Sequence, residues 1–189
     1  MNRTSLQFDE VIMKCRELFE KKFYDYGSSF RILRTSSVTD QIYIKVKRLV
    51  TLQTSAVQKV DDENEEDCFI AIVNYSIIGL IQLEKGTSEN LEENRDSTLQ
   101  LYDKFAKEAK DLMMRKNHDY GEAWRIMRVT SITDLIYQKV LRVKNIEDRQ
   151  GKLLVSEGLD ANYYDILNYA VFSLIKIWEE NAEFKGKFT

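Results

Sequence analysis

The chain has 189 residues, of which 43% are hydrophobic and 31% charged, enough to bury one sizeable core or two small cores that share an interface. Its net charge of −3 gives no general electrostatic attraction to nucleic acid or to an anionic membrane. No apolar run approaches the roughly 18–20 residues of a membrane span, and residues 1–5 lead into a charged amphipathic stretch. We therefore expect a cytoplasmic protein with no nucleic-acid or membrane partner.

The sequence contains an internal duplication. Asp25-Tyr26-Gly27 recurs as Asp119-Tyr120-Gly121, and the same offset of 94 aligns the residues after each triplet without a gap. Between positions 25 and 48 fourteen of twenty-four residues are identical in the two copies, and the charged positions recur as faithfully as the apolar ones. A period of 94 residues indicates a duplicated domain, because solenoid repeats run roughly 20 to 50 residues. The predicted division is repeat one at 1–85, a polar linker at 86–97 and repeat two at 98–189.

The first predicted helix of each repeat ends just before the glycine of the Asp-Tyr-Gly triplet. The chain has no proline and seven glycines, so few residues interrupt helical periodicity. Apolar side chains from Leu6 to Phe19 fall at helical spacing, and those from Tyr102 to Met113 repeat the pattern. Glycine is a common C-cap residue, which sets the predicted end of both helices.

Second and third helices follow in each repeat. Ser37 and Ser131 each precede an acidic residue by three positions, which is capping-box spacing and predicts that the second helices start there. The third helix of repeat one is predicted to begin in the acidic segment at 61–63, and it is apolar nearly all round, as is its twin. We therefore predict an all-α fold in which two three-helix units pack as an intramolecular pseudo-dimer. Cys15 and Cys68 fall in apolar helical patterns, which predicts that both are core thiols.

The third helices carry the strongest candidate for a metal site. Asp165 lies deep in an apolar run, where a carboxylate requires a cation or a hydrogen-bond network. Helical geometry places Glu157, Asp165 and Asn168 on one stripe, as oxygen ligands of Mg²⁺ would be. In repeat one the stripe holds Glu63 and Asp67, with alanine in place of Asp165. The alternative for Glu157 and Glu63 is a first-turn acid that favours the helix dipole.

Repeated cations lie on the second helix. Asp134, Lys139 and Arg142 recur in repeat one as Asp40, Lys45 and Arg48. Lys139 and Arg142 are one turn apart and are able to face a phosphate together. The alternative is a solvated helix face with the aspartate as a capping acid.

The segment around the Asp-Tyr-Gly triplet adds further candidates. Lys116 precedes the triplet, and Trp124-Arg125 follows it. Tyr120 and Trp124 have rings that stack on a nucleobase in some sites and pack under a loop in others. His118 is not repeated, and we assign it no role.

Taken together, these residues resemble the nucleotide-modification-associated domain family over nearly the whole chain. In outline they are also similar to the all-α nucleoside triphosphate pyrophosphohydrolases, the group that includes MazG and the dimeric dUTPases. Glu157-Gly158-Leu159-Asp160 fits the second acidic helix motif of those enzymes, and the first motif has no clear counterpart, since Glu17 and Glu20 align with Asp111 and Met114.

The resemblance implies Mg²⁺-dependent hydrolysis of a nucleoside triphosphate, unmodified or modified, to a monophosphate and pyrophosphate. The predicted catalytic residues are Asp119, Asp134, Glu157 and Asp165, with Glu157, Asp165, Glu63 and Asp67 as predicted Mg²⁺ ligands. The predicted nucleotide-binding residues are Lys116, Tyr120, Trp124, Arg125, Lys139, Arg142, Asn168, Asp25, Asp40, Lys45 and Arg48. The alternatives are a non-catalytic nucleotide-binding or regulatory protein, and an assembly module in which repeated charges form salt bridges between the copies. Related domains form oligomers, so a homo-oligomer is also expected.

Overall fold

The computed structural model describes residues 2–55, 63–149 and 157–181. Its described part holds six α-helices and two short 3₁₀ helices, with no strand, which confirms the predicted all-α class. In chain order the elements are α1 (Arg3–Tyr26), η1 (Ser29–Ile32), α2 (Thr35–Thr54), α3 (Glu65–Lys85), α4 (Arg95–Tyr120), η2 (Ala123–Ile126), α5 (Val129–Asp148) and α6 (Leu159–Glu180). The last three residues of the predicted linker therefore form the first turn of α4.

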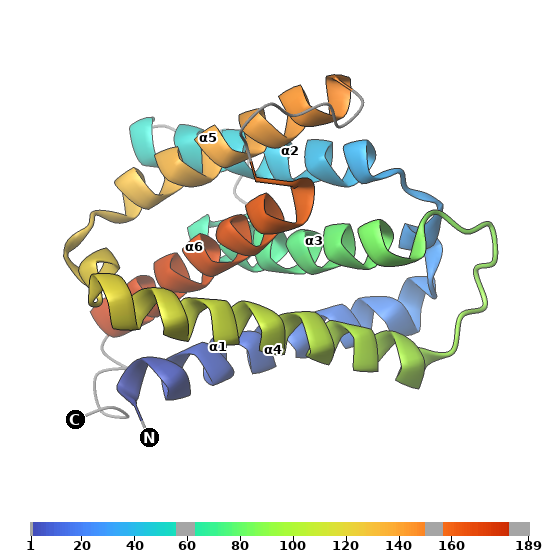
Figure 1. Cartoon of the computed structure of the whole chain (residues 1–189), viewed down its shortest axis with the longest axis horizontal. Coiled ribbons are helices and arrows are strands. Elements are labelled where there is room, and N and C mark those ends of the chain that lie inside the picture. Colours follow the sequence, from blue (N-terminus) through green and yellow to red (C-terminus); the bar gives the residue numbers. More distant parts are fainter. Residues whose placement is uncertain (1, 56–62, 150–156, 182–189) are drawn as a thin grey trace.

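The helices form three layers (Figure 1). Helices α3 and α6, the third helices of the two repeats, lie in the middle and pack on each other more extensively than any other pair. Helices α2 and α5 cover one side, and α1 and α4 cover the other. Most side chains of α3 and α6 are buried, so the predicted apolar centres form a single shared core.

Residues related by the offset of 94 meet across the repeats. Tyr43 on α2 and Tyr137 on α5 are equivalent, and their ring centroids lie 5.9 Å apart. Lys47 lies over the Tyr137 ring and Lys144 over the Tyr43 ring. Contact between equivalent residues is expected only near a two-fold axis, so the repeats pack as a pseudo-dimer.

By length and composition alone, helix α3 is apolar enough to cross a membrane, which corrects the expectation that no apolar run approaches such a span. Its 18-residue window has a mean hydropathy of 1.4, and 72% of that window is buried inside the protein. The apolar surface of α3 is therefore covered by its own neighbouring helices.

The predicted ends of the first helices are confirmed. Helix α1 ends at Tyr26 and α4 at Tyr120, and the following Gly27 and Gly121 adopt φ of 59° and 63°. This left-handed region is costly for residues that carry a Cβ, so glycine at both positions lets the chain turn sharply into η1 and η2.

The predicted starts of the second helices are wrong by two residues. Helices α2 and α5 begin at Thr35 and Val129, so Ser37 and Ser131 lie inside the first turn and do not cap it. The capping box of repeat one instead lies at α3, where Asn64 accepts from the Asp67 amide and Asp67 accepts from the Asn64 amide. Of the acidic segment predicted to start this helix, residues 61 and 62 lie outside the described residues.

Both cysteines are free and buried, as predicted. Burial raises the pKa of the Cys68 thiol to about 12, and burial raises the pKa of the Cys15 thiol as well. Both side chains therefore stay protonated at neutral pH and pack as small apolar groups.

A hydrogen bond between the repeats has a glutamate on one side of the pseudo-dimer and a glutamine on the other. Thr39 donates to Glu147 over 2.9 Å, and at the equivalent place Gln53 donates to Thr133 over 3.1 Å. Burial raises the pKa of the Glu147 carboxyl, although the Thr39 bond opposes this. The folded state then binds this proton more tightly than the unfolded state does. The Glu147 carboxyl therefore lowers the free energy of unfolding as pH rises through its pKa.

We expect Glu147→Gln, which copies Gln53, to remove this loss. Its melting temperature relative to the original chain should be higher at pH 7 than at pH 4, as measured by circular dichroism. Asp148→Asn, one residue away and exposed, is the control and should show a smaller pH dependence. An equal difference at both pH values would contradict the role given to Glu147.

Candidate functional site

A buried carboxylate of repeat two is held between two lysines from two other helices. Asp165 on α6 is 7% exposed. The Lys116 ammonium, from the last turns of α4, lies 2.5 Å from its Oδ1, and the Lys139 ammonium, from α5, lies 2.6 Å from its Oδ2. We call Lys116, Lys139, Glu157 and Asp165 the repeat-two cluster. Its three helices all face the viewer in Figure 1.

The pairing explains how an aspartate is tolerated beside the core. An ionised carboxylate in an apolar run is strongly unfavourable unless cations or donors compensate it. Both oxygens of Asp165 are compensated, and with Glu157 the cluster holds two ammonium groups and two carboxylates. The Lys139 side chain is 13% exposed and that of Lys116 is 48% exposed. The cluster is therefore buried at Lys139 and opens to solvent at Lys116.

Glu157 lies at the edge of the cluster. Its side chain is 67% exposed, and its Oε2 is 4.0 Å from the Lys139 ammonium. Glu157 and Asp165 thus contact one and the same ammonium, which brings together two of the residues predicted to hold Mg²⁺. No three His, Cys, Asp or Glu side chains come together as a metal site in the described ranges. The two carboxylates are hard oxygen ligands of the type Mg²⁺ takes together with water and substrate phosphates.

Other residues predicted around the cluster lie on the surface. Asp119 and Tyr120 are exposed at the end of α4, where Asp119 contacts His118. Asp134 and Arg142 are exposed on α5, and neither forms an ion pair with any residue described. Since Asp134 precedes Lys139 by five residues, it points about 140° away around the helix. Arg142 follows Lys139 by three residues and therefore lies closer to the Lys139 face of α5 than Asp134 does.

Three predicted nucleotide-binding residues are engaged inside the protein. Trp124 is buried and stacks on Phe172, with ring centroids 4.3 Å apart and planes within 3°. The Asn168 amide donates to the carbonyl of Ala109 over 3.1 Å. The Arg125 guanidinium forms a network with Glu122, Glu179, Thr4 and Gln7. This geometry fits the alternative in which the Trp124 ring packs inside the protein under a loop.

Repeat one arranges its equivalent residues differently. The Lys45 ammonium pairs with Glu63 over 2.6 Å, and Arg48 donates to the Glu63 carbonyl over 3.2 Å. Although partial burial lowers it, the bond to Glu63 raises the pKa of Lys45 overall. Asp67 serves the α3 cap, and Asp40 pairs with Lys144 of the other repeat. The Asp40–Lys144 pair is a salt bridge between the two repeats, as the assembly-module alternative predicts.

A pocket opens in repeat one at the place that Asp165 occupies in repeat two. It has a volume of about 440 Å³ and lies between α1, η1 and α3, with Ala71 in its wall. Lys22, equivalent to Lys116, lies at this pocket, and the rings of Phe19, Phe30 and Tyr75 line it. Gly27 also contributes to the wall of the pocket. Asp25, two residues before it, is exposed and does not line the pocket. Sequence reasoning missed this pocket, although the exchange of aspartate for alanine was visible.

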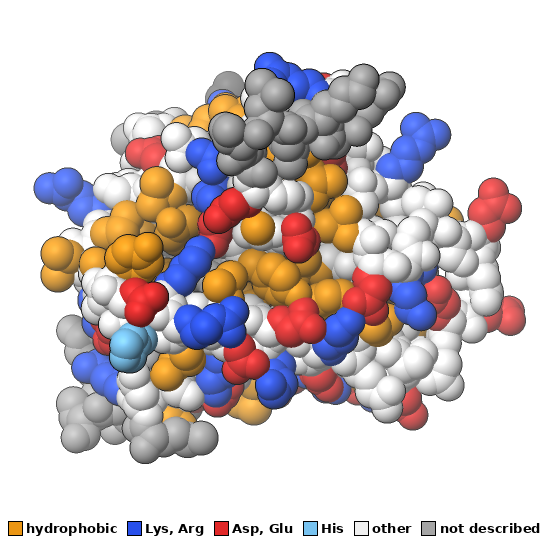
Figure 2. Space-filling model, in the orientation of Figure 1, with side chains coloured by type: hydrophobic (Ala, Val, Ile, Leu, Met, Phe, Trp, Pro, Cys, Tyr) orange, Lys and Arg blue, Asp and Glu red, His pale blue; other side chains and the backbone are white. Residues whose placement is uncertain are grey.

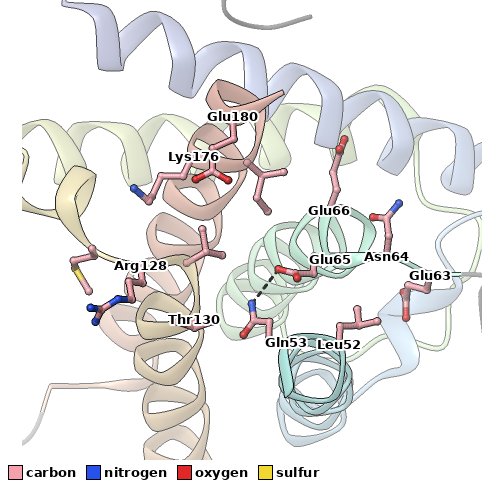
Figure 3. A pocket seen from close by; sticks show the side chains of 13 residues that line it. Leu52, Gln53, Glu63, Asn64, Glu65, Glu66, Arg128, Thr130, Lys176 and Glu180 are labelled. Carbon is pink, nitrogen blue, oxygen red and sulfur yellow. Dashed lines mark hydrogen bonds between the residues drawn. The ribbon is translucent and has the colours of Figure 1, made fainter. Parts of the chain in front are cut away.

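A wider groove of about 1090 Å³ separates the two repeats on another side (Figure 3). Glu65 and Glu66 of α3 line one side of it, and Arg128 and Lys176 of repeat two line the other. Each carboxylate has a separate partner, because Gln53 donates to Glu65 and Lys14 pairs with Glu66. The acids of this groove therefore do not share one cation, as those of the repeat-two cluster do.

The surface around these sites is of mixed charge. Figure 2 shows acidic and basic side chains interspersed on the face of α4, α5 and α6, with hydrophobic side chains between them. A small ligand with a concentrated charge suits isolated lysine pairs on such a face better than a polyanion does.

The comparison with protein families matches both repeats at the same relative positions. The model of nucleotide modification associated domain 1 matches residues 22–83 and 116–177, about two thirds of the chain. The matched segments begin at the equivalent lysines Lys22 and Lys116, and each includes the second helix and most of the third helix of its repeat. No curated protein and no solved structure matches the chain. The chain belongs to the nucleotide modification associated domain 1 family and carries two tandem copies of its domain.

Proposed function

We propose that this protein binds a nucleotide and that the repeat-two cluster holds its phosphates. The observation that carries the proposal is the convergence of Lys116 and Lys139 on the buried Asp165. Two ammonium groups at one point are able to bind a compact anion. The association of the family with nucleotide modification favours the phosphate of a nucleotide as that anion. Lys116 reaches solvent and supplies the side from which a phosphate enters.

The activity we propose for this site is Mg²⁺-dependent pyrophosphohydrolysis of a nucleoside triphosphate. The oxygen of a water molecule forms a bond to the α-phosphorus, the bond from that phosphorus to the bridging oxygen breaks, and pyrophosphate leaves. We assign the proton of that water to Glu157, the exposed carboxylate of the cluster. Lys116 and Lys139 turn from Asp165 toward the phosphates and offset their negative charge.

The carboxylates of Asp165 and Glu157 are the residues that would hold Mg²⁺, whose charge favours attack by water when it is bound. Two considerations support this assignment. Both side chains contact the same Lys139 ammonium, and Glu157 opens the segment 157–160 that resembles the second acidic helix motif of the pyrophosphohydrolases.

The test is pyrophosphate release from a panel of unmodified and base-modified nucleoside triphosphates, with Mg²⁺ and with EDTA. We expect release only with Mg²⁺, and a fall of at least 100-fold in kcat for Asp165→Asn. Asp111→Asn, an exposed aspartate on the same helix as Lys116, is the control and should keep the original rate. The enzyme proposal fails if no triphosphate yields pyrophosphate, or if Asp165→Asn retains full activity.

A non-catalytic nucleotide-binding protein is the second candidate. It is favoured by the pairing of both Asp165 oxygens with lysines, which leaves the carboxylate fully compensated without a metal. A ligand that binds the folded state raises the melting temperature by mass action. Thermal stabilisation by a nucleotide, with no pyrophosphate formed, would therefore support this second candidate.

A further inference from the structure

All four positions of the repeat-two cluster have equivalents in repeat one, and only one of them changes chemically. Lys116 corresponds to Lys22, Lys139 to Lys45 and Glu157 to Glu63, whereas Asp165 corresponds to Ala71. In repeat two the carboxylate lies between the two ammonium groups at 2.5 and 2.6 Å. Repeat one therefore keeps both cations and the outer glutamate, and lacks the carboxylate that lies between the two lysines in repeat two.

The contacts of the two lysines of repeat one agree with this. Lys22 is exposed at the pocket and forms no ion pair with the residues that the structure describes. Lys45 is paired with Glu63 over 2.6 Å, as Lys139 contacts the equivalent Glu157. Lys22 lines the pocket, whereas Lys45 lies outside its lining. Because Lys45 is equivalent to Lys139, which contacts Asp165, repeat equivalence puts Lys45 on the side of Ala71.

The remaining wall of the pocket is aromatic. The ring centroid of Phe19 is 6.5 Å from that of Phe23 and 5.9 Å from that of Phe30. In repeat two the residues equivalent to Phe30 and Ile78 are Trp124 and Phe172, whose rings stack on each other. The pocket volume of about 440 Å³ is within the range of small-ligand sites.

We propose that the repeat-one pocket binds a nucleoside monophosphate, with its phosphate in the place of the Asp165 carboxylate and its base among the aromatic rings. The inference deepens the proposed function, on which it rests for the choice of a nucleotide. Without a ligand, the Asp165 carboxylate of repeat two occupies the place between the lysines that we assign to the phosphate in repeat one. Charge complementarity between the phosphate and the two ammonium groups needs no metal, so this binding is independent of Mg²⁺.

Calorimetric titration of the whole chain in EDTA with the four common deoxynucleoside monophosphates tests the proposal. We expect binding of at least one of them, and at least tenfold weaker binding of the corresponding nucleoside and of inorganic phosphate. Ala71→Asp restores the carboxylate of repeat two and should weaken binding at least tenfold. Ala71→Asn has nearly the same size without the charge and should weaken it less.

A second variant distinguishes the loss of a ligand contact from a folding defect. Lys22 is exposed, so Lys22→Ala should keep the original melting temperature while it weakens monophosphate binding. Asp111→Asn, at an exposed aspartate of the other repeat, should leave monophosphate binding within twofold of the original. The inference is wrong if no monophosphate binds, if a nucleoside binds as tightly as its monophosphate, or if neither Lys22→Ala nor Ala71→Asp weakens binding.

The two proposals fail separately. Pyrophosphate release that depends on Asp165, without monophosphate binding that depends on Ala71, would overturn only the repeat-one site. Monophosphate binding that Ala71→Asp abolishes, with no pyrophosphate from any triphosphate, would overturn only the proposed hydrolysis.

Discussion

Gly79→Ala is expected to lower the free energy of unfolding by about 1–3 kcal/mol, because it overfills the contact between the two central helices. A Cβ added at Gly79 on α3 would lie 2.5 Å from Cε1 and 2.7 Å from Cζ of the Tyr163 ring on α6. Real carbon atoms do not approach so closely. The Tyr163 ring is completely buried, and its hydroxyl lies 2.7 Å from that of Thr39. The ring therefore cannot move aside without breaking that bond.

Two effects oppose each other at this position. Alanine favours a helix over glycine by roughly 1 kcal/mol, which offsets part of the clash. The equivalent residue in repeat two is Ser173, whose buried hydroxyl has no hydrogen-bond partner in the described part of the chain. Ser173→Ala is therefore the control, and we expect it to be neutral or stabilising. Urea unfolding measures both variants, and a Gly79→Ala variant as stable as the original chain would contradict the packing argument.

The fold was predictable because the sequence repeats its core pattern. The duplicated Asp-Tyr-Gly triplets fixed the ends of the first helices, and the apolar run from Ile70 to Ile81 identified the central helix. Both are local signals that need no tertiary information. The starts of α2 and α5 were not predictable from the capping pattern, because Ser37 lies inside the first turn of a helix that begins after the extended Arg34.

The candidate site was predictable in part. Burial of Asp165 follows from its apolar neighbours, and its need for a cation follows from its charge. That the cations are Lys116 and Lys139 follows only from how α4 and α5 pack against α6. The same limit applies to Asp67, whose spacing to Glu63 resembled a metal stripe while the structure uses it in the α3 cap.

Asn74→Ala is expected to lower the free energy of unfolding by roughly 2–5 kcal/mol, because it leaves two buried groups without partners. The Asn74 amide donates to the Cys15 carbonyl over 3.0 Å, and its oxygen accepts from the Tyr102 hydroxyl over 2.8 Å. Cys15 belongs to repeat one and Tyr102 to repeat two, so one side chain joins both repeats. Urea unfolding followed by circular dichroism measures the loss.

The pseudo-two-fold provides a matched control for this prediction. Asn168 donates to the Ala109 carbonyl as Asn74 does to Cys15, but its oxygen is buried and accepts no bond from the described residues. The residue equivalent to Tyr102 is Phe8, which has no hydroxyl to donate. Asn168→Ala should therefore cost less than Asn74→Ala, about 1–3 kcal/mol.

Phe8→Tyr adds, in repeat one, the hydroxyl that Tyr102 carries at the equivalent position of repeat two. By the pseudo-two-fold it should reach the Asn168 oxygen and raise the free energy of unfolding by about 0.5–1.5 kcal/mol. Combined with Asn168→Ala the gain should vanish, because the acceptor is gone. If Phe8→Tyr instead destabilises the chain to the same degree with and without Asn168, the two repeats do not place these residues equivalently. The asymmetry at Asp165 and Ala71 would then no longer follow from repeat equivalence alone.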